Sequence, residues 1–406
     1  MYEQTRRTLF YSRRIVGLVF SLAALSFLLS WTTESSAAQG ERERGKRLAR
    51  VIQAPEALAS QTLRPVVDAV ASVPGMRNSF VSSDDYDARA IYHVDIRNVS
   101  WRSREGKSYE ATIYHPTSRP IAGSSFSAVV YSPGLGAAPE NFKYLALSWA
   151  SRGVVCVMLH HPESDDKLWR GKVRPMANVK EAYQHYWTGR DRAMAIRSAI
   201  DLIYYPLGDV QSIFENVNRR KIAVAGNDLG ALGALLVAGQ LPPDNGPSLY
   251  DERVSAVLAM SPPVFCEAEQ GPEVYAYVSV PLMVVTGTKD DGIVGSTKAY
   301  QRRVPYDSVR FSDRYLVVLE GGDHRVYGGH NVGKQNSDAM YQDTIRIATS
   351  DFLSAYLQDD YSTLMNMRQV GSSMGLNNAI VEKRLMPLTL DSVSAASGNS
   401  SMRIEY

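Results

Sequence analysis

Three residues that could together perform nucleophilic chemistry stand at well-separated points of the chain, each directly after an apolar run. Asp228 is the central residue of Gly226-Asn-Asp-Leu-Gly230, and Asp290 and His324 follow two later runs. A nucleophile, a histidine base and a carboxylate that orients this base make up a catalytic triad. The chain order predicts Asp228 as the nucleophile, Asp290 as the orienting acid and His324 as the base.

Two neighbouring residues compete for these roles. Asp291 is an alternative acid, since one of two adjacent aspartates commonly caps the turn that they share. His330 is an alternative base. We favour His324 because it lies nearest the end of its apolar run, and Asp290 as the first of the two aspartates.

The turn around Asp228 has the spacing of a nucleophile elbow, in which a strand passes through a sharp turn into a helix. Gly226 and Gly230 suit such a turn because strand and helix approach each other closely. A second glycine-containing turn, Ser132–Gly136, follows an earlier apolar run. The backbone N–H groups of Leu229, Leu135 and Gly134 are therefore predicted to form an oxyanion hole.

The elements that must position these residues can be read from the apolar runs. The first two runs alternate apolar and polar residues, as the strands of an edge hairpin do, whereas the later runs are continuously apolar, as buried parallel strands are. Helical patterns separate the later runs, which predicts an α/β fold with an eight-stranded, mostly parallel sheet flanked by helices. The predicted strands are Ile91–Val99, Tyr109–Tyr114, Ala128–Ser132, Val154–His160, Ile222–Ala225, Val257–Met260, Leu282–Thr286 and Tyr315–Leu319, and the helices Asn141–Ser151, Arg190–Tyr204, Leu229–Gln240 and Met340–Leu357.

One long excursion follows the fourth predicted strand. Residues 162–187 show no clear periodicity and are rich in aromatic residues, which predicts a lid over the site or, alternatively, a surface loop. His160 and His161, just before it, are expected to line the pocket without binding a metal. The side chains that could contact the substrate or donate to a leaving group are Trp169, Tyr183, Tyr186 and Trp187.

The ends of the chain differ in character from its middle. Arginines, an apolar run and small residues predict a signal peptide over residues 1–37, and hence export to the periplasm or the medium; a retained membrane anchor is the alternative. Residues 38–88 are interpreted as an N-terminal extension and 89–360 as the catalytic domain. Residues 361–406 are interpreted as a partly disordered C-terminal extension.

The composition favours a soluble enzyme that acts on a small molecule. A net charge of +2 with 21% charged residues gives no sign of a nucleic-acid partner, and two cysteines form neither a disulfide scaffold nor a metal site. We therefore expect no metal and no cofactor. The oligomeric state is left open.

Taken together, several short motifs resemble a secreted bacterial branch of the α/β-hydrolase superfamily, whose members are dienelactone-hydrolase-like, chlorophyllase-like or platelet-activating-factor-acetylhydrolase-like. The resemblance implies an α/β-hydrolase fold and cofactor-independent ester hydrolysis by a Ser–His–Asp triad, with the acid and base at Asp290 and His324. The nucleophile position carries Asp228 instead, which is similar to the aspartate elbows of epoxide hydrolases and haloalkane dehalogenases. The matching stretches are Ser132–Gly136, Leu145–Gly153, His161–Asp165, Gly287–Asp291 and Gly322–His324.

An aspartate at this position restricts the chemistry. To cleave an ordinary ester it would form an anhydride by expelling an alkoxide about 12 pKa units more basic than itself, roughly 16 kcal/mol uphill. At an sp³ carbon, by contrast, a carboxylate can open an epoxide or displace a halide. Three hypotheses follow: a hydrolase with Asp228 as the nucleophile, an ester hydrolase in which Asp228 is a general base or a spectator, and a non-catalytic binding protein that has lost its serine.

Overall fold

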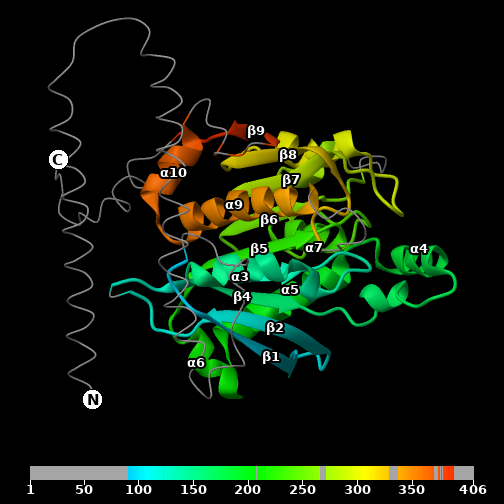
Figure 1. The fold of residues 1–406 in the computed structure, drawn as a ribbon. Helices are drawn as coiled ribbons and strands as arrows, with labels where there is room; N and C mark the ends of the chain where they lie inside the picture. The colour runs from blue at the N-terminus through cyan, green and yellow to red at the C-terminus, as the bar shows by residue number, and fades with distance from the viewer. Residues whose placement is uncertain are drawn as a thin grey trace, which may run out of the picture. The chain divides into compact units, whose positions relative to one another are not determined.

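The computed structural model describes residues 90–387, apart from 122, 207, 266–270, 329–336, 370–373, 375 and 377. These residues form a mixed α/β fold around one nine-stranded sheet (Figure 1). Its strands are β1 (Val94–Arg102), β2 (Ser108–Pro116), β3 (Phe126–Ser132), β4 (Val154–Leu159), β5 (Val217–Asn227), β6 (Ala256–Met260), β7 (Leu282–Lys289), β8 (Arg314–Asp323) and β9 (Ala379–Arg384).

The strands lie in the order β1-β2-β4-β3-β5-β6-β7-β8-β9. Strand β2 is antiparallel to both β1 and β4, and β9 is antiparallel to β8. All other neighbouring pairs are parallel. The carboxyl ends of β3, β5, β6, β7 and β8 therefore meet at one edge of the sheet, which is where the candidate residues follow.

The sheet has nine strands, so the prediction of eight is wrong by one. The eight predicted strands are all present, and β9 is added from residues assigned to the C-terminal extension. Strand β9 is short, half exposed and charged, with Ile380 50% exposed. Such a segment is typical of an edge strand, whose outer side needs no apolar cover, and it therefore carries little hydrophobic signal.

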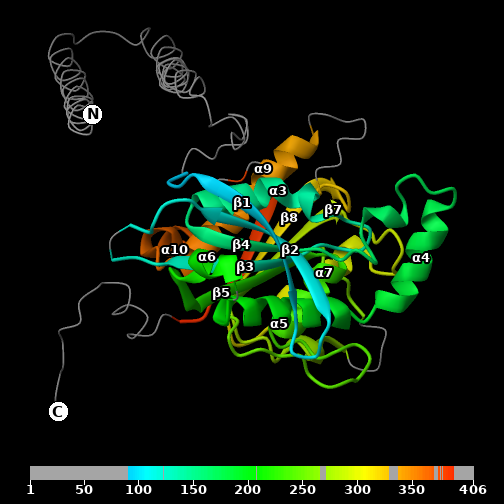
Figure 2. The same cartoon turned by 90° about the horizontal axis from the view of Figure 1, so that it is seen from below.

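Helices cover both faces of the sheet (Figures 1 and 2). Helices α3 (Lys143–Ser151) and α9 (Ser337–Leu357) contribute to one apolar core, and α5 (Arg190–Tyr204) and α7 (Leu229–Val237) to the other. Strand alternation divides β3 between them, with Val129 and Tyr131 facing α3 and α9 while Ala128 and Val130 face α5 and α7. The other helices are α4 (Pro175–Tyr186), α6 (Gln211–Phe214), α8 (Val304–Ser308) and α10 (Tyr361–Arg368).

Helix α4 forms within residues 162–187, the excursion that shows no clear periodicity in the sequence. It lies at one side of the described fold in both views, away from the core of the sheet (Figures 1 and 2). Only Val179 and Ala182 of this helix are buried. The apolar stripe is too narrow to be distinguished from a loop by sequence pattern alone.

Several predictions fall outside the described residues, namely the signal peptide, the N-terminal extension, the alternative base His330 and the end of the C-terminal extension. Within the described ranges, no helix is both long enough and apolar enough to span a membrane.

Candidate active site

The elbow places Asp228 between β5 and α7 in an unusual backbone conformation. Its φ is +48° and its ψ is −125°, a region that residues other than glycine rarely adopt. The Asp228 N–H donates to the Met260 carbonyl at 3.0 Å, and the Asp228 carbonyl accepts from Leu232 N–H at 3.1 Å. Such strain typically costs about 1–3 kcal/mol and is maintained only where the surrounding structure enforces it.

The two elbow glycines are required by space. A Cβ atom on Gly230 would lie 1.9 Å from the Ser132 carbonyl oxygen, and one on Gly226 would lie 2.4 Å from the Gly230 carbonyl carbon. Because backbone atoms of β3, β5 and α7 meet here, the turn after β3 is held directly against the elbow.

The turn after β3 presents its backbone N–H groups to the elbow side chains. Leu135 N–H points to Asp228 Oδ2 at 3.4 Å, whereas Gly134 N–H donates to Asn227 Oδ1 at 2.9 Å. Leu229 is the first residue of α7, where N–H groups have no partner within the helix. Of the three N–H groups predicted for the oxyanion hole, Leu135 thus contacts the Asp228 carboxylate and Gly134 is used by Asn227.

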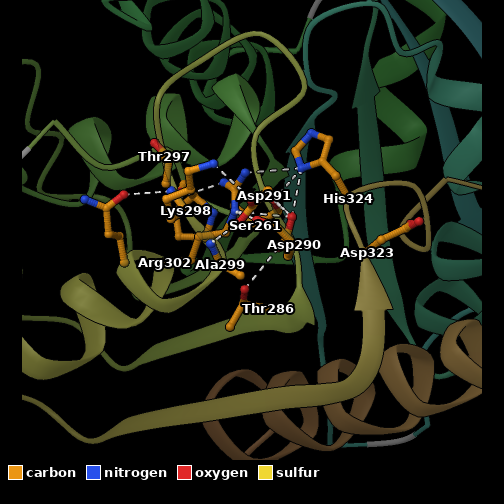
Figure 3. Close-up of polar contacts among 12 residues, drawn as sticks. Ser261, Thr286, Asp290, Asp291, Thr297, Lys298, Ala299, Arg302, Asp323 and His324 are labelled. Atoms are coloured by element: carbon orange, nitrogen blue, oxygen red, sulfur yellow. Dashed lines mark hydrogen bonds and ion pairs between the residues drawn. The ribbon is translucent and has the colours of Figure 1, made fainter.

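The predicted acid and base are in direct contact (Figure 3). His324 Nδ1 donates to Asp290 Oδ1 at 2.9 Å, and Asp290 is fully buried. Asp291 is exposed and accepts from Ala299 N–H and Lys298 Nζ, which lowers its pKa. Asp290 therefore contacts His324, while Asp291 caps the turn.

Four further side chains surround the Asp290 carboxylate, and sequence reasoning identified none of them. Ser261 Oγ donates to Oδ1 at 2.9 Å, and Oδ2 accepts from Tyr327 at 2.8 Å and from Thr286 at 3.0 Å. Burial, followed by the charge of Asp290, raises the pKa of the Tyr327 phenol well above its usual value. Ser261 follows the end of β6 at φ +50°, so its position at a strand end was the one signal available.

The fourth neighbour is Arg302, which forms a buried ion pair with Asp290. Arg302 Nε lies 3.2 Å from Asp290 Oδ1 and donates to the Asp290 carbonyl at 2.6 Å, and the side chains are 1% and 0% exposed. Its Nη1 donates to the carbonyl of Ser261, and its Nη2 lies 3.3 Å from His324 Nδ1. Since Nδ1 donates to Asp290, Nε2 is the ring nitrogen of His324 left for chemistry.

A cavity of about 710 Å³ is lined by both Asp228 and His324. This volume is within the range of small-molecule sites. Met176, Val179 and Tyr183 of α4 form one wall at helical spacing. Burial, followed by the charge of Asp228, raises the pKa of the Tyr183 phenol.

The other aromatic residues predicted to contact substrate are placed differently. Trp169 lines the cavity, but its indole N–H donates to the Gly136 carbonyl at 2.7 Å. Tyr186 and Trp187 are absent from the described lining, and Trp187 packs on Phe265. Of these four residues, Tyr183 is thus the one that lines the cavity and whose hydroxyl group forms no hydrogen bond among the described residues.

His160 and His161 follow β4, and neither is among the described residues that line the cavity. His160 Nε2 contacts Thr112 Oγ1 at 2.8 Å, and His161 Nε2 contacts Ser132 Oγ at 2.9 Å. Burial, then the charge of Arg192, lowers the pKa of His161 well below its usual value. No group of three or more metal-ligating side chains occurs in the part of the chain that the structure describes.

No protein-family model matches the chain, and a search of curated proteins finds no match either.

Proposed function

We propose that this protein is a hydrolase of the α/β-hydrolase fold that acts on a small lipophilic substrate through a covalent ester of Asp228. The strand order supports the fold, since β2 is antiparallel and the elbow, the acid and the histidine follow β5, β7 and β8. In this fold the nucleophile, the acid and the histidine occur in that chain order.

The observation that carries the proposal is the placement of the Asp228 carboxylate. Oδ2 faces the Leu135 N–H at 3.4 Å, and the side chain lines the same cavity as His324. Oδ1 is then the oxygen left to attack an sp³ carbon, forming an alkyl ester and expelling the leaving group with its electron pair.

The second step regenerates the carboxylate. His324 Nε2, held through Nδ1 by Asp290, removes a proton from water as the water oxygen attacks Asp228 Cγ. Negative charge then develops on Oδ2, where the Leu135 N–H faces it. Collapse of this intermediate breaks the bond between Cγ and Oδ1, and the proton that His324 took from water passes to the departing oxygen, which leaves as the alcohol.

Tyr183 favours an epoxide over a haloalkane as substrate. Opening an epoxide leaves an alkoxide that needs a proton, which a phenol on the cavity wall can supply. Tyr341 also lines the cavity, but its hydroxyl group donates to the Glu320 carbonyl at 2.6 Å. Tyr183 is therefore the acid that we assign to the leaving oxygen.

Ester hydrolysis with Asp228 as a spectator is less well supported. An ester carbonyl oxygen would need the place opposite the Leu135 N–H, and Asp228 Oδ2 occupies that place. The third hypothesis, a binding protein that has lost its serine, is tested by the same experiment as the proposed function.

The experiment is a single turnover in ¹⁸O-water with a panel of epoxides, haloalkanes and short esters, followed by mass measurement of the peptide that carries Asp228. The proposal predicts ¹⁸O in the Asp228 carboxylate, because water attacks Cγ. Turnover without label contradicts covalent catalysis. No turnover with any substrate, together with esterase activity in Asp228→Ser, identifies the binding protein.

We also propose that the protein is exported. This proposal depends on the sequence of residues 1–37 alone. The mass of the protein recovered from the periplasm or the medium tests it, and a chain that retains these residues contradicts removal of a signal peptide.

A further inference from the structure

Arg192 is a buried arginine without an ion-pair partner at contact distance. It lies near the start of α5, is 2% exposed, and has no carboxylate oxygen within 4.0 Å among the residues that the structure describes. Its Nε has no hydrogen-bond partner there either. A buried cation is costly unless an anion offsets it, so this position needs an explanation.

The side chain of Arg192 is closely packed. Its Cβ is so close to α7 that a Cβ atom on Gly233 would lie 2.5 Å from it. The guanidinium group lies over the Tyr186 ring, 5.8 Å from the centroid. The guanidinium charge therefore lies between the Tyr186 ring and the Gly134 carbonyl oxygen.

The anion that offsets Arg192 most strongly is Asp228. Burial lowers the pKa of Arg192 to about 10, and the Asp228 carboxylate is the largest influence in the opposite direction. One peptide unit connects the two groups. Arg192 Nη2 lies 3.5 Å from the Gly134 carbonyl oxygen, and the N–H of the same peptide, on Leu135, points to Asp228 Oδ2 at 3.4 Å.

A peptide unit is planar, and its C=O and N–H bonds point in opposite directions, so that their dipoles add along the unit. A cation at the carbonyl oxygen polarises the unit and makes its N–H a stronger donor at the other end. We propose that Arg192 is a positioning residue that supports negative charge on Asp228 Oδ2 through the Gly134–Leu135 peptide. Its consequence for catalysis rests on the proposed role of Asp228 as the nucleophile.

Of the two chemical steps, only the second depends strongly on this charge. In the first step the Oδ1–carbon bond forms, the substrate C–O bond breaks, and the leaving oxygen takes a proton from Tyr183. The carboxylate becomes a neutral ester, so Arg192 gives this step no help. In the second step the water oxygen bonds to Cγ, His324 takes the proton, and the carbonyl electron pair moves to Oδ2. Arg192 stabilises this charge.

The decisive experiment compares Arg192→Met, Arg192→Lys and wild type by rapid quench and intact-protein mass measurement with an epoxide substrate. Arg192→Met should slow hydrolysis of the Asp228 ester by about 10–100-fold, below the 10²–10³ typical of losing a direct donor, because Arg192 acts through a peptide. Formation of the ester should change less than about threefold, so the ester accumulates. Arg192→Lys retains the charge and should recover part of the rate.

Arg197→Met is the matched control, since Arg197 lies on the same helix with a 40% exposed side chain beside Asp251. It should change neither step. Equal slowing of both steps by Arg192→Met, or an unchanged balance between them, overturns the proposal.

A second measurement does not require activity and separates this proposal from the proposed function. Unfolding equilibria are compared for wild type, Asp228→Asn, Arg192→Met and the double variant. If Arg192 supports the Asp228 charge, the double variant should be more stable than the two single effects predict, by about fivefold or more in the unfolding constant. Additive effects overturn the proposal even where Asp228 forms an ester, and coupling upholds it where no ester is found.

Discussion

Replacing Asp290 by asparagine tests the buried network behind His324. The carboxylate accepts hydrogen bonds from Ser261, Thr286, Tyr327 and His324 and pairs with Arg302, and both members of this ion pair are almost fully buried. Asparagine is nearly the same size but has lost the charge. Its NH₂ group can only donate: in the place of Oδ1 it faces the N–H groups of Arg302 and His324, and in the place of Oδ2 it requires the hydroxyls of Thr286 and Tyr327 to turn and accept.

The expected cost follows from leaving Arg302 buried and unpaired. Breaking one side of a buried ion pair typically costs about 3–5 kcal/mol. Asp291→Asn is the matched control, because Asp291 is adjacent, its side chain is 54% exposed, and its pairing with Lys298 is solvated. Surface ion pairs contribute about 0–1 kcal/mol, and so the two neighbouring substitutions should differ by several kcal/mol.

Urea and thermal unfolding would measure this difference. At about 2–4 °C per kcal/mol, Asp290→Asn should lower Tm by roughly 6–20 °C and Asp291→Asn by only a few degrees. The double variant Asp290→Asn/Arg302→Met should recover part of the loss, since replacing a whole buried pair by neutral groups is often nearly neutral. Similar losses for Asp290→Asn and Asp291→Asn, or additive effects in the double variant, would refute the reasoning.

Three further predictions concern the elbow, helix α4 and the half-buried His161. Gly230→Ala should destabilise the fold by about 3 kcal/mol, the upper end for overpacking, because its Cβ would lie 1.9 Å from the Ser132 carbonyl oxygen; a Tm loss under about 2 °C contradicts this. Tyr183→Phe should lower kcat for an epoxide by about 10²-fold while hardly changing that for a haloalkane, since only the epoxide oxygen needs a proton; equal losses with both substrates contradict this. Burial lowers the pKa of His161, so below the unfolded value of about 6.5 the unfolded chain binds a proton that the folded chain does not, and stability falls as the pH falls. His161→Gln should remove this part of the pH dependence, up to about 1.4 kcal/mol per pH unit, and an unchanged slope of stability against pH between about 5 and 6.5 contradicts it.

The parts of the site that could be predicted are those with a local signal. Asp228, Asp290 and His324 each follow a continuously apolar strand, and parallel strands bring such positions to one edge of a sheet. Arg192 and Arg302 gave no such signal, because an arginine in a helical segment is usually a solvated surface residue. Their burial depends on contacts between segments far apart in the chain.

The same reasoning explains the errors in the fold. Strand β9 and helix α4 have few buried positions, and a hydrophobic pattern detects an element only through the face that it buries. The sequence alone could not separate Asp290 from Asp291 either. Both residues are aspartates, and they differ only in the direction in which the backbone points their side chains.

The proposed coupling of Arg192 to Asp228 through the Gly134–Leu135 peptide also bears on whether the elbow once carried serine. If Asp228 merely replaced a serine in an otherwise unchanged site, Asp228→Ser should fit without cost and gain esterase activity. Arg192, however, is buried beneath the elbow, and Asp228 is the carboxylate that most offsets its charge. We therefore expect Asp228→Ser to lower Tm, Asp228→Ser/Arg192→Met to recover part of the loss, and neither variant to hydrolyse short esters. A stable, esterase-active Asp228→Ser would instead mean that the site is built for serine and that the aspartate is incidental to it.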